Sequence, residues 1–306
     1  MPVDGWLTVY CLLIAAASLI GARLPAWVRF THARMQLIIS FVAGLMLGVA
    51  LLQLLPHAVE STRAVPLTMM WTLNGLLAMF FLIRAFDFHH HAGVDEEEHE
   101  HGHDHDHGHG SSGTHRLSWL GVFLGLTVHT AIDGAALAAI MKAESIARPE
   151  NWWGLGVFLA ILLHKPLDAL SITTVMMAGG WSNRAQLAVA VCFAATCPVG
   201  AALFFLGIEQ FGGDQSLVIG CALAFSAGVF LCISLGDLLP ELHFHGHDRV
   251  PLSITLLMGV ALAYLISQGH IHPPRDARPR DASGQSGSLN PSRNPTRQVV
   301  RLENLE

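Results

Sequence analysis

Residues 124–172 begin with LGLTVHTAIDGAALAAI and end with VFLAILLHKPLDALSI, two stretches too hydrophobic for the surface of a soluble protein. Each stretch nevertheless carries a histidine followed four residues later by an aspartate: His129 with Asp133, and His164 with Asp168. Residues four apart lie on the same face of an α-helix. An ionisable group at membrane depth is costly unless it pairs, lines a cavity or holds an ion. Since imidazole and carboxylate are ligands for divalent transition metals, the two pairs favour a path for metal ions.

The composition is that of a polytopic membrane protein. The chain has 306 residues, of which 52% are hydrophobic and 13% are charged, and its mean hydropathy is +0.47. A soluble globular protein carries a charged fraction of roughly 25%. Eight apolar segments are each long enough to cross a bilayer, which takes ~20 helical residues. These segments are residues 6–24, 37–58, 66–86, 117–141, 152–178, 185–208, 216–240 and 250–269.

The predicted fold class is all-α. Backbone in lipid must satisfy its hydrogen bonds within a helix or a closed barrel, and the alternating ten-residue strands of a barrel are absent. Residues 1–269 therefore form the predicted transmembrane domain. A polar insert at 87–116 interrupts it, and a tail at 270–306, rich in proline, arginine and serine, is expected to be disordered. The five cysteines lack CxxC spacing, and no basic aromatic patch points to nucleic acid.

Arginine and lysine residues predict the orientation in the bilayer. Eight spans place both chain ends on one side of the membrane. The connections after the odd-numbered spans carry seven of these residues, and those after the even-numbered spans carry three. The positive-inside rule therefore places both termini outside the cell and the insert in the cytoplasm. The predicted location is the plasma (inner) membrane. The six arginines of the tail oppose this orientation, but the tail is synthesised last and weighs less.

An internal repeat supports a transporter architecture. The stretch AGLMLGVALLQLLPHA at 43–58 aligns without gaps on AGVFLCISLGDLLPEL at 227–242. The two stretches fall in the second and seventh spans, which run in opposite directions. A repeat of inverted topology is a pattern of transporters that hold their substrate between two halves. Chance resemblance between leucine-rich helices is the alternative, so the repeat only supports the assignment.

Three further residues bear on the two His/Asp pairs. Pro166 removes a backbone donor and is expected to loosen the fifth span, and Gly134 permits close approach of helices. Lys165 lies three residues before Asp168, where its ammonium can pair with that carboxylate. A fixed cation would repel a second metal ion, so one divalent ion is expected, unless Lys165 only balances charge beside water.

Two alternatives to metal binding apply to the pairs. A single His/Asp pair between membrane helices is about equally well explained as a satisfied polar contact, and two copies on successive helices weaken that reading. Histidine and aspartate also serve in proton relays.

Other polar residues within the spans are weaker candidates. Gln53 and Asp237 occupy equivalent places in the repeat, and with His57 and Glu241 they are candidates for positions where an ion enters or leaves. A helix end near water explains the charged members equally well. Cys197 is a candidate soft ligand, although packing explains it more simply.

The insert is rich in metal-binding side chains. It holds ten of the nineteen histidines of the chain and eight acidic residues. Alternating histidine and carboxylate in a flexible segment provides many weak metal sites and no packed core, although a solvated acidic loop is the alternative. The predicted metal-binding members are His99, His101, His103, His105, His107 and His109.

These motifs resemble those of the ZIP (Zrt/Irt-like) divalent metal transporters. HTAIDG at 129–134 is similar to the fourth-span motif His-Asn/Ser-x-x-Asp/Glu-Gly, and HKPLD at 164–168 to the fifth-span motif His-Glu-x-Pro-x-Glu. LLP at 54–56 and DLLPE at 237–241 also match the family pattern, and the resemblance covers all eight spans and the His-rich insert.

The resemblance implies eight helices arranged 3+2+3, with inverted repeats around the fourth and fifth spans, and import of metal into the cytosol. It implies that His129, Asp133, His164 and Asp168 form the primary metal site. Three departures fall on the family's second metal position, which is therefore in doubt: Thr130 replaces asparagine, Lys165 an acidic residue and Cys197 a glutamate.

The leading functional hypothesis is therefore import of Zn²⁺, with Cd²⁺, Fe²⁺ or Mn²⁺ as further substrates, by a protein that is not an enzyme. A homodimer is compatible with such a bundle. A metal exporter would need six spans and a folded C-terminal domain. An intramembrane zinc hydrolase would need a nucleophile or a general acid/base near the metal. Ser171 lies one turn from Asp168, but helix packing explains it more simply.

Overall fold

The structure is a computed structural model that describes residues 3–27, 31–86, 114–147, 153–244 and 249–268. Within these ranges all regular structure is helical. The predictions for the tail, and those for the insert up to residue 113, lie outside the described residues.

The described helices form eight spans that are long and apolar enough to cross a membrane, which confirms the prediction of an all-α polytopic membrane protein. The second span combines three consecutive helical segments, α2, η1 and α3. In chain order the elements are α1 (Val3–Trp27), α2 (His32–Val49), η1 (Ala50–Leu54), α3 (Leu55–Thr62), α4 (Val65–Phe86), α5 (Thr114–Ala147), α6 (Leu155–Ala178), α7 (Asn183–Gln210), α8 (Gln215–Phe244) and α9 (Arg249–Gln268).

Pro56 in the second span and Pro166 in the fifth act differently on their helices. Ahead of Pro56 the chain forms the π-helical segment η1, in which the Leu55 N–H donates to the carbonyl of Ala50, five residues earlier. A proline has no N–H to give, and a local π turn is one way for the ladder to adjust. By contrast, α6 continues as an unbroken α-helix through Pro166, so the expected loosening of the fifth span is not seen.

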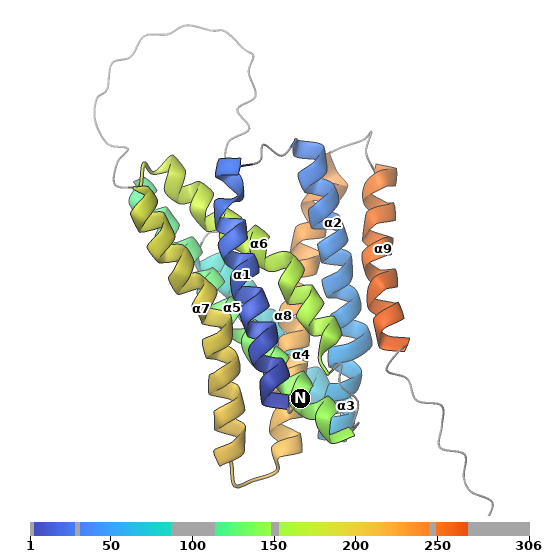
Figure 1. Cartoon of the computed structure of the whole chain (residues 1–306). Coiled ribbons are helices and arrows are strands. Elements are labelled where there is room, and N and C mark those ends of the chain that lie inside the picture. Colours follow the sequence, from blue (N-terminus) through green and yellow to red (C-terminus); the bar gives the residue numbers. More distant parts are fainter. Residues whose placement is uncertain (1–2, 28–30, 87–113, 148–152, 245–248, 269–306) are drawn as a thin grey trace, which may run out of the picture. The chain divides into compact units, whose positions relative to one another are not determined.

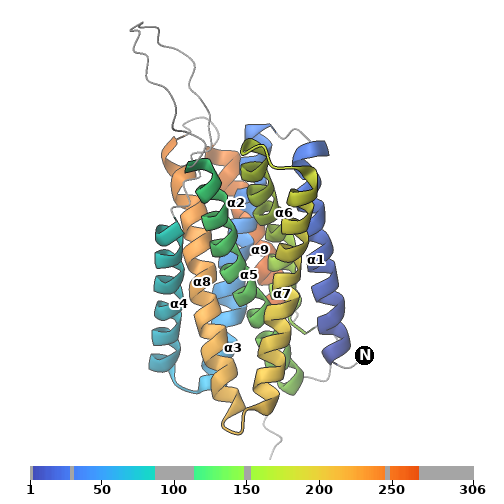
Figure 2. The same ribbon diagram turned by 90° about the vertical axis from the view of Figure 1, so that its left-hand side faces the viewer.

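Close helix contacts reproduce the sequence repeat in space. The helix α2 packs along α9, and α8 packs along α4 (Figures 1 and 2). A methyl group on Gly44 would lie 2.2 Å from the carbonyl oxygen of Leu256, and one on Gly228 would lie 2.0 Å from the carbonyl oxygen of Thr72. Gly228 lies as many residues after Gly44 as Leu256 lies after Thr72. The two contacts are therefore equivalent, and the spans 2–3 and 7–8 are related as an inverted repeat.

The same relation holds around the central helices. The helix α1 packs on α6, and α7 packs on α5. A methyl group on Gly21 would lie 2.3 Å from the Cα of Pro166, and one on Gly200 would lie 2.3 Å from the carbonyl oxygen of Ala131. Pro166 and Ala131 are the middle residues of the two His-x-x-x-Asp motifs. The repeat thus relates α5 to α6. Each His-x-x-x-Asp motif packs against an equivalent helix of the repeat, α7 or α1.

A completely buried apolar layer lies along α5 on the C-terminal side of its motif. All six residues of 136–141 are 0% exposed. They belong to one core cluster with Leu54 of η1 and with Val157 and Ile161 of α6. This layer separates the two motifs from the end of the bundle at which α5 ends and α6 begins.

Candidate metal centre

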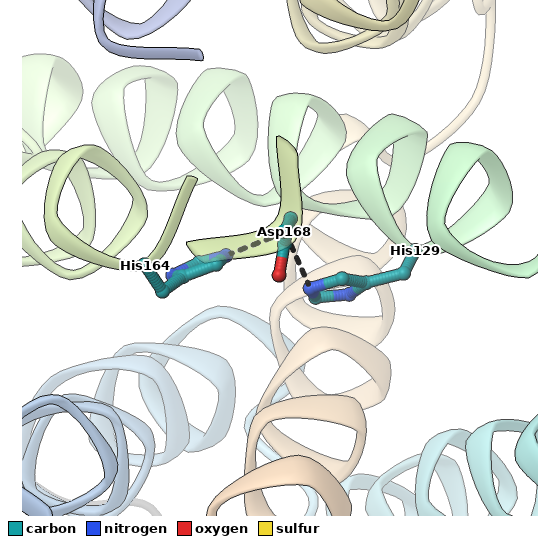
Figure 3. A group of neighbouring side chains, drawn as sticks. All are labelled: His129, His164 and Asp168. Carbon is teal, nitrogen blue, oxygen red and sulfur yellow. Dashed lines mark ion pairs between the residues drawn. The ribbon is translucent and has the colours of Figure 1, made fainter. Parts of the chain in front are cut away.

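The two motifs meet between α5 and α6. The Asp133 Oδ2 atom lies 3.4 Å from His129 Nε2 on its own helix and 3.3 Å from His164 Nε2 on the neighbouring helix. The Asp168 Oδ2 atom lies 3.9 Å from His164 Nε2 and 4.0 Å from His129 Nε2. Figure 3 shows the Asp168 carboxylate between the two imidazole rings. All four side chains therefore point toward one region.

This region is buried and has the size of a metal site. His129, Asp133 and His164 are at most 5% exposed, and the Asp168 side chain is 16% exposed. One ligand atom from each of His129, His164 and Asp168 lies within 4.8 Å of the others. Nitrogen and oxygen ligands bind zinc at about 2.0–2.2 Å, so two ligands of one ion are separated by at most ~4.4 Å. Small side-chain movements are sufficient to close the set around one ion.

The His164 ring is oriented for ligation. Its Nδ1–H donates to the carbonyl oxygen of Ala160 at 2.7 Å, because a carbonyl can only accept. The neutral ring therefore carries its lone pair on Nε2, the nitrogen that faces the two carboxylates. Metal-binding histidines commonly donate the other ring N–H to a carbonyl or carboxylate, which fixes the tautomer and the ring orientation.

Lys165 is the cation of this region. It is 0% exposed, and its ammonium donates to the Asp133 carboxylate, to Asp168 Oδ2 at 2.9 Å and to His164 Nε2 at 3.2 Å. Its pairing with Asp168 follows the i, i+3 spacing, whereas its pairing with Asp133 bridges α6 to α5. A lysine that contacts three of the four ligand-type side chains occupies much of the space of a second cation.

Three buried polar atoms of the α5 motif have no hydrogen-bond partner among the described residues: His129 Nδ1, Thr130 Oγ1 and Asp133 Oδ1. Buried polar atoms are nearly always paired, and exceptions point to a functional site, a water or an ion. Thr130 is 1% exposed, and no described backbone group accepts its hydroxyl. The donor set and these atoms together fit one hydrated divalent ion.

Cys197 reaches the region through its backbone. It is 1% exposed, and its carbonyl oxygen would lie 2.1 Å from a methyl group on Gly134, the residue after Asp133. Gly134 therefore permits the close approach of α5 and α7. The cluster of candidate metal ligands found among the described residues does not include the Cys197 thiol.

The candidates for ion access fall into two groups. Gln53 and His57 lie near Glu144, whose carboxylate Oε1 is 3.7 Å from His57 Nε2. Glu144 could not be singled out from the sequence, because a carboxylate in the last turns of an apolar helix is ordinary. Asp237 and Glu241 lie in the last turns of α8, whose side chains are not described. The six insert histidines, His99 to His109, also lie outside the described residues.

Comparison with known proteins agrees with the motifs. The family model for the ZIP zinc transporters matches residues 83–267, more than half of the chain. The zinc transporter ZIP9 of Micropogonias undulatus is 27% identical over 164 residues, 49% of this chain and 51% of that protein. The chain thus spans about half the length of the curated relative. The matched region contains both His/Asp motifs, which confirms the predicted resemblance: the chain belongs to the ZIP zinc transporter family.

Proposed function

We propose that the protein imports divalent transition metal ions, zinc first, into the cytosol through the centre formed by His129, Asp133, His164 and Asp168. The observation that carries the proposal is the convergence of two imidazoles and two carboxylates in one buried region between α5 and α6. Membership of a zinc transporter family and similarity to the zinc transporter ZIP9 support zinc as the substrate. Cadmium, iron(II) and manganese(II) are further proposed substrates, because such ligand sets follow metal availability as much as affinity.

In this proposal the ligands replace the hydration shell of the ion within the membrane. The lone pair of His164 Nε2 already faces the carboxylates, so the ring needs no change of tautomer to bind. The Lys165 ammonium must withdraw from the carboxylates when the ion arrives, and its charge limits the centre to one metal ion. The inverted repeat then supplies the two halves whose relative movement exposes the ion to either side.

The proposed orientation places both termini outside, in the plasma (inner) membrane. The insert then lies on the cytosolic side, where its histidines would accept or sense the incoming ion. We propose a homodimer as the oligomeric state.

An intramembrane hydrolase is the less favoured function. The Ser171 hydroxyl donates to the carbonyl oxygen of Leu167 at 3.0 Å, so it is used by its own helix. We therefore propose that the protein is a transporter and not an enzyme. An exporter of the cation-diffusion class would need six spans, and eight are described.

The test is zinc-65 uptake into proteoliposomes by the wild-type protein and by His164→Ala and Asp168→Ala. Loss of a ligand is expected to lower saturable uptake about tenfold or more, since even supporting partners of a ligand change affinity by 10–100-fold. Ser171→Ala, on the same helix, is the matched control and should transport normally. Absence of uptake by the wild-type protein, or unchanged uptake by both ligand variants, would overturn the proposal.

A further inference from the structure

A second histidine–carboxylate pair lies at the end of the bundle at which α5 ends and α6 begins. His57 of α3 faces Glu144 of α5, with 3.7 Å between His57 Nε2 and Glu144 Oε1. The other carboxylate oxygen, Oε2, accepts the backbone N–H of Gly154 at 2.8 Å, just before α6 begins. Glu144 is 3% exposed, so its negative charge is buried, and the donor to its Oε2 atom is a neutral backbone N–H.

His57 is oriented as His164 is. Its Nδ1 lies 2.8 Å from the carbonyl oxygen of Gln53, four residues earlier, and must be the protonated nitrogen because a carbonyl only accepts. The neutral ring therefore turns its Nε2 lone pair toward Glu144. A lone pair and a carboxylate oxygen face each other only when a cation lies between them, either a proton or a metal ion. The same i−4 anchoring occurs at His164 in the candidate metal centre.

The distance between the two atoms suits ligands of one ion. Zinc binds imidazole nitrogen and carboxylate oxygen at about 2.0–2.2 Å, and a tetrahedral angle then separates the two ligand atoms by roughly 3.4 Å. The observed 3.7 Å exceeds the length of a good hydrogen bond and lies close to this ligand spacing.

Buried polar groups around the pair are not satisfied. Gln53, in the π-helical segment η1, is 2% exposed, and its amide nitrogen has no hydrogen-bond partner in the described part of the chain. Its amide group lies directly against Gly156, two residues after the glycine that Glu144 holds. Tyr10 stacks on Phe158 in the first turn of α6 at 4.0 Å between ring centroids, and no described residue bonds its buried hydroxyl. Such atoms point to a ligand or ordered water.

This pair is separate from the candidate metal centre. Glu144 follows Asp133 on α5 by eleven residues, which corresponds to ~16 Å along the helix axis. The fully buried apolar residues 136–141 lie between them. An ion at the pair therefore cannot share ligands with an ion at the centre.

We infer that His57 and Glu144 form a second binding site for a divalent transition metal ion, completed by water. Its role rests on the proposed function: with the termini outside, this end of the bundle faces the exterior, and the site is the first station of an incoming ion. Two protein ligands make it weaker than the centre, so an ion can leave it toward the centre.

The binding test is independent of transport. Zinc-65 bound at saturation is measured by equilibrium dialysis of the purified Asp133→Asn/Asp168→Asn protein, and of the same protein carrying Glu144→Gln. Metal held by the insert is common to both and cancels. Glutamine retains an oxygen for the Gly154 N–H, so the fold is preserved. A loss of one ion per chain supports the site. Equal binding overturns it and identifies the pair as a protonated histidine–glutamate contact.

The transport test uses the otherwise wild-type protein with His57→Gln, Glu144→Gln and the double variant. If both residues bind one ion, each single variant should raise the KM for zinc about tenfold, and the double variant should raise it no further. Glu60→Gln, an exposed carboxylate on α3, is the matched control. A change in kcat at unchanged KM would overturn the site. Absence of uptake by the wild-type protein would overturn the proposed function, while the dialysis result would still decide the site.

Discussion

Lys165 determines the charge of the candidate metal centre. Two carboxylates, Asp133 and Asp168, lie within its reach, and its ammonium contacts both. Without metal, the lysine neutralises one of the two negative charges. When a divalent ion binds, the attraction between the carboxylates and the lysine is replaced by attraction to the ion. The lysine therefore stabilises the metal-free protein and competes with the metal.

Replacement of Lys165 by methionine should separate these two effects. Lys165→Met removes one partner of a buried ion pair, which costs about 3–5 kcal/mol, so the thermal unfolding midpoint should fall. Zinc should then restore more stability to the variant than to the wild-type protein, because no ammonium competes for the carboxylates. Differential scanning fluorimetry in detergent, with and without zinc, measures both changes.

Lys142→Met is the control for this substitution. Lys142 is on α5, pairs with Glu209 at 3.3 Å and is 22% exposed, so its removal should change stability by no more than about 1 kcal/mol. If zinc raised the midpoint equally in Lys165→Met and the wild-type protein, competition between lysine and metal would be excluded.

At the residue scale, contacts within one helix could be predicted and contacts between helices could not. The i, i+4 spacing of each His/Asp pair and the i, i+3 spacing of Lys165 and Asp168 place these side chains on one face. The contact of Lys165 with Asp133 depends on how α5 and α6 pack. The contact of His57 with Glu144 likewise joins two helices that are far apart in sequence.

At the scale of the helix, glycine sets how closely the spans approach. The backbone of α4 lies so near Gly228 of α8 that any side chain there would overlap the Thr72 carbonyl. Gly236, two turns further along α8, has no heavy atom of the described residues within 4 Å of the position a Cβ would take. The same helix therefore provides a glycine that is required for packing and one that is not.

Alanine substitution should distinguish the two glycines. Gly228→Ala is expected to lower the free energy of unfolding by about 1–3 kcal/mol, because backbone atoms of α4 must move. Gly236→Ala should be neutral or stabilising by up to about 1 kcal/mol, because alanine favours the helix. The thermal midpoint of the purified protein measures both effects. Equal midpoints for the two variants would contradict the close contact.

The existence of the helices could be predicted from sequence, but their local irregularities could not. Apolar length alone identifies eight spans, since a bilayer requires helices of ~20 residues. The two prolines look alike in sequence, yet Pro56 follows a π-helical segment and Pro166 lies in a regular helix. The residues beside the two prolines did not predict this difference.

At the scale of the whole molecule, the inverted repeat relates the two halves of the described bundle. The sequence showed this repeat only in the second and seventh spans. The equivalent contacts of Gly21 with Pro166 and of Gly200 with Ala131 extend it to the spans that surround the centre. The residues that make these two contacts are not similar in sequence, because one contact includes Pro166 and the other includes Ala131. The two helix contacts have the same geometry although their residues differ, so the sequence alone could not reveal this part of the repeat.

The orientation of this bundle in the membrane makes a testable difference between its two ends. The turn between α7 and α8 lies at the same end of the bundle as the start of α1, and the start of α7 lies at the opposite end (Figure 2). Gly212 belongs to that turn, and Asn183 is the first residue of α7. Both are exposed. The excess of arginine on the connections after odd-numbered spans predicts that Gly212 faces the exterior and Asn183 the cytoplasm.

In intact cells, a membrane-impermeant maleimide should label Gly212→Cys at once and Asn183→Cys only after permeabilisation. The parent protein, with its five cysteines, gives the background. Labelling in the reverse order would show that the bundle has the opposite orientation in the membrane, with His57 and Glu144 facing the cytosol.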